Sequence, residues 1–274
     1  MGAFAYQLAD GRLHLQHGPI DLICEAWGLP DMITIGYRRA CTRFDGLLDE
    51  LTAELPALRR ENEALTGPIA VSMARAVAPF RPLFITPMAA VAGAVAEAVL
   101  AALVGPGIRR AYVNNGGDIA LHLAQGEHLV CAVAGTDSKI AVRYCDAARG
   151  IATSGWRGRS WSLGIADSVS VLAKTASMAD AAATMIANAV DLPGHPAVIR
   201  KPATDLQNDS DLGTRLVTVG VGPLNRSDVC EALARGEAAA TAYHRAGLIE
   251  SAALFLRGET RIVGSVYLKE NTFA

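Results

Sequence analysis

The chain has 274 residues, of which 51% are hydrophobic and 19% are charged. A chain of this length can bury a sizeable core, and this composition excludes an intrinsically disordered protein. The 25 Lys and Arg residues nearly balance the 27 Asp and Glu residues, which excludes general nucleic-acid binding through a basic surface.

The first part of the chain is predicted to form two short strands and then three helices. The strands are expected at 12–16 and 20–26, and the helices at 44–65, 69–77 and 88–104. Leucines at helical spacing indicate the first helix, and Pro56 is expected to kink or divide it. The third helix is alanine-rich, contains Glu97 and is shorter than the roughly 20 residues that span a membrane. We therefore expect it to be a buried helix, and no membrane to be involved.

The rest of the chain is predicted to be mostly strands joined by short turns, with two helices among them. The strands are expected at 110–114, 119–123, 128–134, 140–144, 169–173, 216–221, 249–257 and 261–267, and the helices at 178–190 and 225–246. The polar segment 201–214 is expected to be an exposed loop, and Asn225 or Ser227 to cap the last helix. Because the helices are grouped rather than strictly alternating with strands, we predict an α+β fold with largely antiparallel sheets packed with helices.

The cysteines and the N-terminus indicate the compartment. The five cysteines are far apart and none forms a C-x-x-C pair, which argues against a zinc or iron–sulfur site held by thiolates. Their odd number fits a reducing compartment. Residues 1–10 lack the basic and apolar regions of a secretory signal. We therefore expect a cytoplasmic protein.

A polar turn between two predicted strands is the first candidate site, and it contains Asn114, Asn115, Gly116, Gly117 and Asp118. Consecutive glycines let a backbone approach a ligand closely and present N–H groups to anionic oxygens. The flanking polar side chains can hydrogen-bond a ligand. The same sequence also suits a tight hairpin turn, which is the commoner meaning of such a pattern. The two interpretations are compatible, because the tip of a hairpin can line a site.

The second candidate is the run of Thr153, Ser154 and Gly155. Two hydroxyls before a glycine can form a polar nest for a phosphate or a carbonyl. Taken alone, the run is more simply a loop with Ser and Thr turns. Trp156 and Trp161 follow it, and their rings could stack on an aromatic ligand or cover a hydrophobic edge.

Asp180 and Thr184 form the third candidate. They are four residues apart on the predicted helix 178–190, so they share one face. A carboxylate with a hydroxyl is a suitable partial shell for magnesium, which takes oxygen ligands. The alternative is a capping box, in which Ser177 and Asp180 satisfy the first amides of the helix. On local evidence alone the cap is the commoner meaning.

The order of these motifs resembles the ApbE family, the FAD:protein FMN transferases. An apolar helix, Asn-x-Gly-Gly-Asp, Ala-Thr-Ser-Gly, a Ser-Val strand and Ala-Asp-x-x-x-Thr follow one another within residues 87–190. The resemblance implies an ApbE-like domain over residues 1–274, in one unit or two intimate lobes, with its motif-bearing core at 87–190. It also implies Mg²⁺ and FAD or a related flavin as cofactors.

The resemblance assigns roles to individual residues as well. It implies that the ligand-binding residues are Asn114, Gly116, Gly117, Asp118, Thr153, Ser154 and Gly155. It implies that Asp180 and Thr184 bind the metal, with a backbone carbonyl of the helix that begins near Met88 also facing it. No catalytic side chain is assigned.

Two departures separate this chain from the transferases. The family's lysine in the apolar helix corresponds to Gly93, and the family's His-x-x-Asp-Pro-x-Thr-Gly loop has no counterpart, since only residues 156–167 occupy the interval. That loop belongs to the transfer apparatus. The sequence therefore most resembles a compact ApbE-like family of bacterial and archaeal proteins to which no reaction is assigned.

Three functions stay open at this point. The first is a magnesium-dependent enzyme acting on a flavin- or nucleotide-like phosphorylated ligand, by FMN transfer or by pyrophosphate hydrolysis. The second is a non-catalytic flavin or nucleotide binder. The third is an enzyme or accessory factor for an unrelated small metabolite on the same fold. All three imply a small-molecule ligand, while an acceptor protein and a homo-oligomer are left open.

Overall fold

A nine-stranded sheet forms the centre of the computed structural model, which describes residues 2–132, 139–265 and 268–269. From one edge to the other, its strands are β1 (Phe4–Gln7), β2 (Leu13–His17), β3 (Ile20–Gly28), β4 (Ile108–Asn115), β5 (Asp118–Leu123), β8 (Gly150–Ser154), β9 (Ser168–Ala173), β12 (Ser251–Leu256) and β13 (Glu259–Gly264). Each strand pairs with its neighbour in antiparallel fashion. Short turns join most sequential neighbours, as the sequence indicated.

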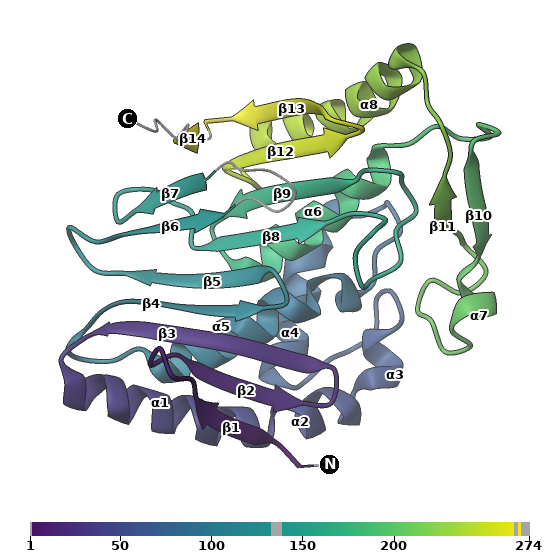
Figure 1. Cartoon of the computed structure of the whole chain (residues 1–274). Coiled ribbons are helices and arrows are strands. Elements are labelled where there is room, and N and C mark those ends of the chain that lie inside the picture. Colours follow the sequence, from purple (N-terminus) through teal and green to yellow (C-terminus); the bar gives the residue numbers. More distant parts are fainter. Residues whose placement is uncertain (1, 133–138, 266–267, 270–274) are drawn as a thin grey trace.

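Helices cover one face of this sheet (Figure 1). The longer helices are α1 (Pro30–Asp45), α4 (Pro68–Val77), α5 (Val91–Leu103), α6 (Ala176–Ala189) and α8 (Arg226–Arg245). The short ones are α2 (Leu47–Ala53), α3 (Leu55–Leu58), α7 (Ala203–Leu206) and two 3-10 turns, Ala78–Phe80 and Pro87–Ala90. The helices α1, α5, α6 and α8 pack side by side, and their apolar faces form the main core with the covered side of the sheet. The predicted α+β fold of largely antiparallel sheets packed with helices is confirmed.

A second, small sheet lies against the other face of the central sheet. Its strands are β6 (His128–Ala132), β7 (Lys139–Arg143) and β14 (Leu268–Lys269), in the order β14-β7-β6. A separate cluster of buried apolar side chains, including Leu121, Leu129, Ile151 and Leu172, joins β6 and β7 to β5, β8 and β9. Among the described residues, no helix is both long and apolar enough to cross a membrane.

The predicted helix 44–65 has the wrong bounds. The helical segment begins earlier, at Pro30, and Gly46 divides α1 from α2. Pro56 lies in the first turn of α3, which ends the helical run at Leu58. The leucine spacing indicated the buried face correctly, but local breaks at glycine and proline determine where each helix begins and ends.

Two segments predicted as loops are partly regular. Thr153 and Ser154 belong to β8, where they pair with Ser170 and Val169 of β9. The segment 201–214 contains the end of β10 (Val198–Pro202) and the whole of α7, and it leads into β11 (Leu216–Val221). The pairing of β8 with β9 and of β10 with β11 orders the strand parts of these segments, and short polar sequences do not show such pairing in advance. Residues 133–134 and 266–267 of the predicted strands lie outside the described residues.

Candidate functional site

The turn between β4 and β5 is the tight hairpin that its sequence predicts. Gly116 and Gly117 have φ angles of 64° and 116°, which favour glycine. The Asn114 side-chain oxygen accepts a hydrogen bond from the Gly117 amide at 2.8 Å. The Asn115 side chain is buried on the helix side of the sheet and donates to the Ala92 carbonyl at 3.1 Å. The turn is therefore tied to the beginning of α5.

Asp180 lies in the second turn of α6 and contacts the beginning of α5. Its Oδ2 accepts a hydrogen bond from the Gly93 amide at 3.1 Å. Ser177, the predicted capping partner, instead donates to Glu97 through its amide and its hydroxyl, at 2.7 and 3.0 Å. The hydroxyl of Thr175 caps the helix. The capping-box alternative is therefore wrong, because Thr175 occupies the cap position and the Asp180 carboxylate contacts α5 instead.

One cavity of about 290 Å³ is lined by Asp118, Ser154, Asp180 and Thr184. This volume is near the small end of the range of about 300–1,000 Å³ for ligand pockets. Asp118 Oδ1 accepts a hydrogen bond from the Thr153 amide at 3.1 Å, which fixes the carboxylate between β5 and β8. Thr184 follows Asp180 by one helical turn, so both side chains reach the same cavity.

The two carboxylates at this cavity have raised pKa values. Burial raises the pKa of Asp118 to about 7, against the hydrogen bond from Thr153 and the charge of Arg159. Burial also raises the pKa of Asp180 well above its usual value, and the negative charge of Asp118 raises it further. The hydrogen bond from Gly93 opposes this shift. Two neighbouring carboxylates held partly out of water are costly to ionise unless a cation joins them.

The donor set fits an ion that also takes oxygens from water or a ligand. Among the described residues, no group of three or more His, Cys, Asp or Glu side chains is placed to hold a metal ion. Asp118, Asp180 and Thr184 offer two carboxylates and one hydroxyl, all of them oxygen donors. Magnesium is commonly bound by one or two carboxylates and completes its shell with water and phosphate oxygens. The cavity thus fits Mg²⁺ better than a metal that needs a full set of protein ligands.

Arg159 and Trp161 line the same cavity next to the glycine turn. A Cβ atom on Gly116 would collide with the Arg159 guanidinium, so this cation lies directly against the turn. The Trp161 side chain is 39% exposed and can offer its face to a ligand. Trp156 instead donates from its ring nitrogen to Asp167 at 3.3 Å. Arg159 is not among the predicted site residues, although it follows Thr-Ser-Gly closely in the sequence.

An arm made of β10, α7 and β11 adds the outer wall of the cavity through residues 207–212. Two contacts hold its tip. The Arg59 guanidinium pairs with the Asp209 carboxylate at 2.7 Å, and the buried Thr86 hydroxyl donates to the Asp211 carboxylate. The acidic residues of this tip belong to the segment that the sequence predicts as an exposed loop. Their polarity showed a surface position but not the partners that hold them.

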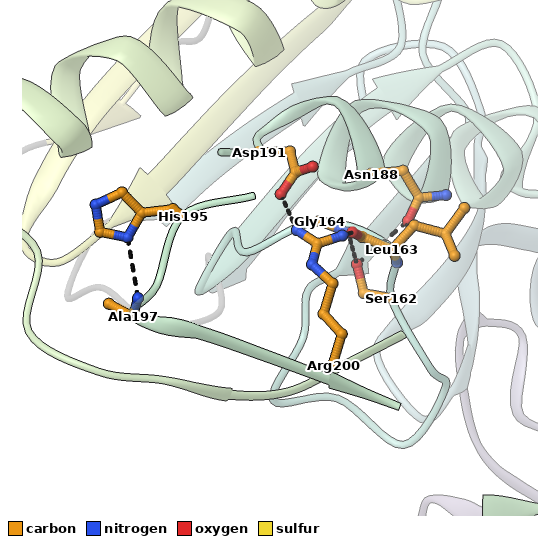
Figure 2. Close-up of polar contacts among 8 residues, drawn as sticks. All are labelled: Ser162, Leu163, Gly164, Asn188, Asp191, His195, Ala197 and Arg200. Atoms are coloured by element: carbon orange, nitrogen blue, oxygen red, sulfur yellow. Dashed lines mark hydrogen bonds and ion pairs between the residues drawn. The ribbon is translucent and has the colours of Figure 1, made fainter. Parts of the chain in front are cut away.

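Figure 2 shows how the base of the arm is anchored. Arg200 of β10 donates to the Asp191 carboxylate and, at 2.7 Å, to the Leu163 carbonyl. The Asn188 side-chain oxygen accepts from the Leu163 amide at 2.9 Å and from the Ser162 hydroxyl at 3.2 Å. Polar contacts therefore hold the arm at its base, beside the end of α6, and at its tip.

The other predicted ligand residues do not reach this cavity. Asn114, Gly117 and Thr153 line a second cavity, on the face of the sheet that the small β6–β7 sheet covers. Thr153 and Ser154 are adjacent in β8, and successive strand residues point to opposite faces. Two predicted glycines line neither cavity, namely Gly116 and Gly155. The structure thus divides the predicted residues between two cavities on opposite faces of the sheet, each lined by a residue at the β4–β5 turn.

A family model described as "AbpE bacteria" matches residues 5–262. The chain belongs to this ApbE-like family. A UPF0280 protein of Methanothermobacter thermautotrophicus is 36% identical over 194 residues, which are 62% of this chain and 75% of the relative. A UPF0280 protein of Methanococcus vannielii is 43% identical over 110 residues, which are 37% of this chain and 44% of the relative. One of Archaeoglobus fulgidus is 36% identical over 104 residues, which are 38% of this chain and 44% of the relative.

A solved structure is also similar to this ApbE-like protein. It is the apo form of the flavinyl transferase ApbE of Pseudomonas stutzeri, with a TM-score of 0.38 and 14% sequence identity over 95% of this chain and 94% of the other. The match to the family model over most of the chain confirms the resemblance that the motif order indicated, and the archaeal relatives agree with it.

Proposed function

We propose that this ApbE-like protein binds the phosphate groups of a flavin- or nucleotide-like ligand together with Mg²⁺, and transfers FMN or hydrolyses a pyrophosphate there. The observation that carries the proposal is the pair of partly buried carboxylates, Asp118 and Asp180, at one cavity. Burying two like charges is unfavourable unless a cation is present or one group is protonated. A divalent ion supplies the missing charge and accepts the oxygen donors that the cavity offers.

The residues of the cavity have separate roles in this proposal. Asp180 and Thr184 would hold the ion, and Asp118 lines the same cavity. The Gly93 amide keeps the Asp180 carboxylate oriented through its hydrogen bond. Bound Mg²⁺ would supply charge stabilisation at the leaving phosphate oxygen. The Arg159 guanidinium, which lies against the glycine turn, is placed to bind a phosphate oxygen and holds no hydrogen bond or ion pair within the described part of the chain.

A non-catalytic flavin or nucleotide binder is the second candidate. Among the described residues that line the cavity there is no His, Lys or Cys side chain to act as nucleophile or proton carrier. The interval in which ApbE transferases carry their His-containing loop is occupied here by residues 156–167. In this interval Trp156 and Arg157 both contact the Asp167 carboxylate, at 3.3 Å. The lack of that loop, together with the lack of a His, Lys or Cys side chain among the described lining residues, is what supports the binder.

The test combines turnover and binding in matched variants. The protein is incubated with FAD and Mg²⁺, and FMN and AMP are measured by mass spectrometry. Asp180→Asn removes the charge but keeps an oxygen that can accept from Gly93, so the fold is expected to survive while magnesium-dependent turnover is lost. Asp205→Asn, at an exposed position of the arm, is the control and should match the unmodified protein.

The possible results separate the proposals. Unchanged turnover in Asp180→Asn would contradict the proposed enzyme. Tight FAD binding that needs Mg²⁺ and Asp180, with FAD recovered intact, would establish the binder instead. An absence of any FAD or nucleotide binding in calorimetry would leave only the third function, an enzyme or accessory factor for an unrelated small metabolite.

A further inference from the structure

A cavity of about 700 Å³ lies on the face of the central sheet opposite α5 and α6. Alternate residues of β3, β4, β5, β8 and β9 form its floor. Residues of β6 and the beginning of β7 form the wall that faces this floor. The intervening residues of the same strands, such as Cys24, Val113 and Ala152, are buried under the helices. This cavity is therefore separated from Asp180 by the thickness of the sheet.

One end of this sheet-face cavity is aromatic. The rings of Trp27 and Tyr112 lie with their centroids 6.0 Å apart at an angle of 46°. Both side chains are only partly buried and both line the cavity. Aromatic side chains in such positions offer a flat apolar surface on which a planar ring can stack. Ile119 and Ile151 continue this apolar floor toward the β4–β5 turn.

The other end is polar and offers hydrogen-bond donors. The Asn114 side chain uses its oxygen for the Gly117 amide, and its NH₂ group has no partner among the described residues. The hydroxyls of Thr153 and Ser170 bond to each other at 2.8 Å, so one of them keeps a hydrogen for a further acceptor. Asn114 and Thr153 are among the residues for which the sequence predicted ligand contact. These two residues therefore line a different cavity from the one that contains Asp180.

The charges at this cavity do not favour an anion. Arg110 stacks on Trp27, with 4.4 Å between the guanidinium carbon and the ring centre, and lies 3.8 Å from the Glu127 carboxylate. Glu25 adds a negative charge to the same wall. The single lining arginine therefore already has a carboxylate partner, and the carboxylate of Glu25 lines the same cavity. A phosphate group is expected to bind more favourably in the cavity lined by Arg159.

We propose that the sheet-face cavity binds an uncharged, planar heteroaromatic ring. The ring stacks on Trp27 and Tyr112, and its carbonyl or ring-nitrogen edge accepts hydrogen bonds from Asn114 and the Thr153–Ser170 hydroxyl pair. An isoalloxazine and a purine both have this chemistry. The inference does not depend on the proposed phosphate chemistry, because the ring needs neither Mg²⁺ nor Asp180.

The experiment uses ligands without phosphate. Riboflavin and adenosine are titrated into the full chain by calorimetry in the presence of EDTA. Tyr112→Ala removes one stacking surface and is expected to weaken binding about tenfold, the size of one stacking contact. Cys131→Trp fills the cavity from the β6 wall and is expected to abolish binding. The control Tyr144→Ala removes a tyrosine that lines a different cavity and should leave affinity unchanged.

Each result decides the proposal. Binding of riboflavin or of adenosine that is weakened by Tyr112→Ala and lost in Cys131→Trp supports it and identifies the ring. A folded wild-type chain that binds neither ligand overturns it, as does equal affinity in wild type and Cys131→Trp. Loss of riboflavin or adenosine binding in Asp180→Asn also overturns it, because the ring would then occupy the other cavity. If Tyr112→Ala does not fold, Cys131→Trp alone decides.

Discussion

The Asp180 carboxylate accepts a hydrogen bond from the Gly93 amide, with 3.1 Å between the oxygen and the nitrogen, where α6 meets α5. This contact needs a glycine, because a Cβ atom at residue 93 would collide with the backbone of Ala176 and Ser177. The lysine that ApbE transferases carry in this helix has no room at this position. Backbone contact between the two helices thus sets the direction in which the carboxylate points.

Gly93→Ala is expected to lower the free energy of unfolding by about 1–3 kcal/mol, the usual cost of overpacking a close contact. It should also weaken Mg²⁺ binding, since separating the helices moves the Gly93 amide away from Asp180. Urea unfolding and calorimetry measure the two effects. Gly46→Ala is the matched control, because open space surrounds Gly46 and its φ of −95° suits any residue. Equal stability of the two variants would contradict the role given to the helix contact.

Asp118 and Asp180 should make stability depend on pH. Burial raises both carboxyl pKa values in the folded protein, so the unfolded chain releases these protons at lower pH. The folded state therefore loses stability relative to the unfolded chain as pH rises from about 4, the ordinary carboxyl value, through about 7. Asp118→Asn removes one charge and keeps an acceptor for the Thr153 amide.

The expected result is a gain in melting temperature for Asp118→Asn over wild type that grows from pH 4 to pH 8 in EDTA. Differential scanning calorimetry across that range measures it. A constant difference between the two proteins would show that the pKa of Asp118 is not raised in the folded protein. Added Mg²⁺ should reduce the gain at pH 8, because the ion compensates the charge that the variant removes.

Elements with strong local signals could be predicted from the sequence. Gly116 and Gly117 require the hairpin turn, and Asn225 with Asp228 forms the capping box that starts α8. The helix α1 had no such signal. Its buried residues are Gly36, Tyr37, Ala40 and Phe44, and because two of these are small, the apolar stripe is weak. Its position is determined by packing on α5 and β3, which a single sequence does not show.

In the candidate site, too, the sequence predicts the parts that have a local motif and misses the parts that depend on contacts between distant residues. The motifs indicated Asp118, Ser154, Asp180 and Thr184, and the structure brings these four to one cavity. The contact between Thr86 and Asp211 joins residues 125 positions apart, and no local pattern encodes it. The division of the remaining motif residues follows from β8 being a strand, since adjacent residues then face opposite sides.

The tip of the arm should depend on the Thr86 hydroxyl. Thr86→Val keeps the shape of a buried side chain but removes the donor to Asp211, and it is expected to cost about 1–2 kcal/mol. Hydrogen exchange should rise in residues 207–213 and stay unchanged in the central sheet. Thr214→Val, at an exposed position of the same arm, is the control. If exchange in 207–213 were the same in both variants, Thr86 would not hold the arm.

The base of the arm should be sensitive to the shape of Arg200 as well as to its charge. The guanidinium donates through Nη1 to the Leu163 carbonyl and through Nη2 to the Asp191 carboxylate, and a lysine ammonium cannot reproduce this pair of directions. Arg200→Lys is therefore expected to lower the free energy of unfolding by about 1–2 kcal/mol and to speed proteolysis of the arm. Arg235→Lys is the control, because Arg235 and Glu231 form an exposed pair on α8 and such pairs contribute about 0–1 kcal/mol. Loss of stability to the same extent in both variants would mean that charge alone, and not the two-directional contact, anchors the arm beside the end of α6.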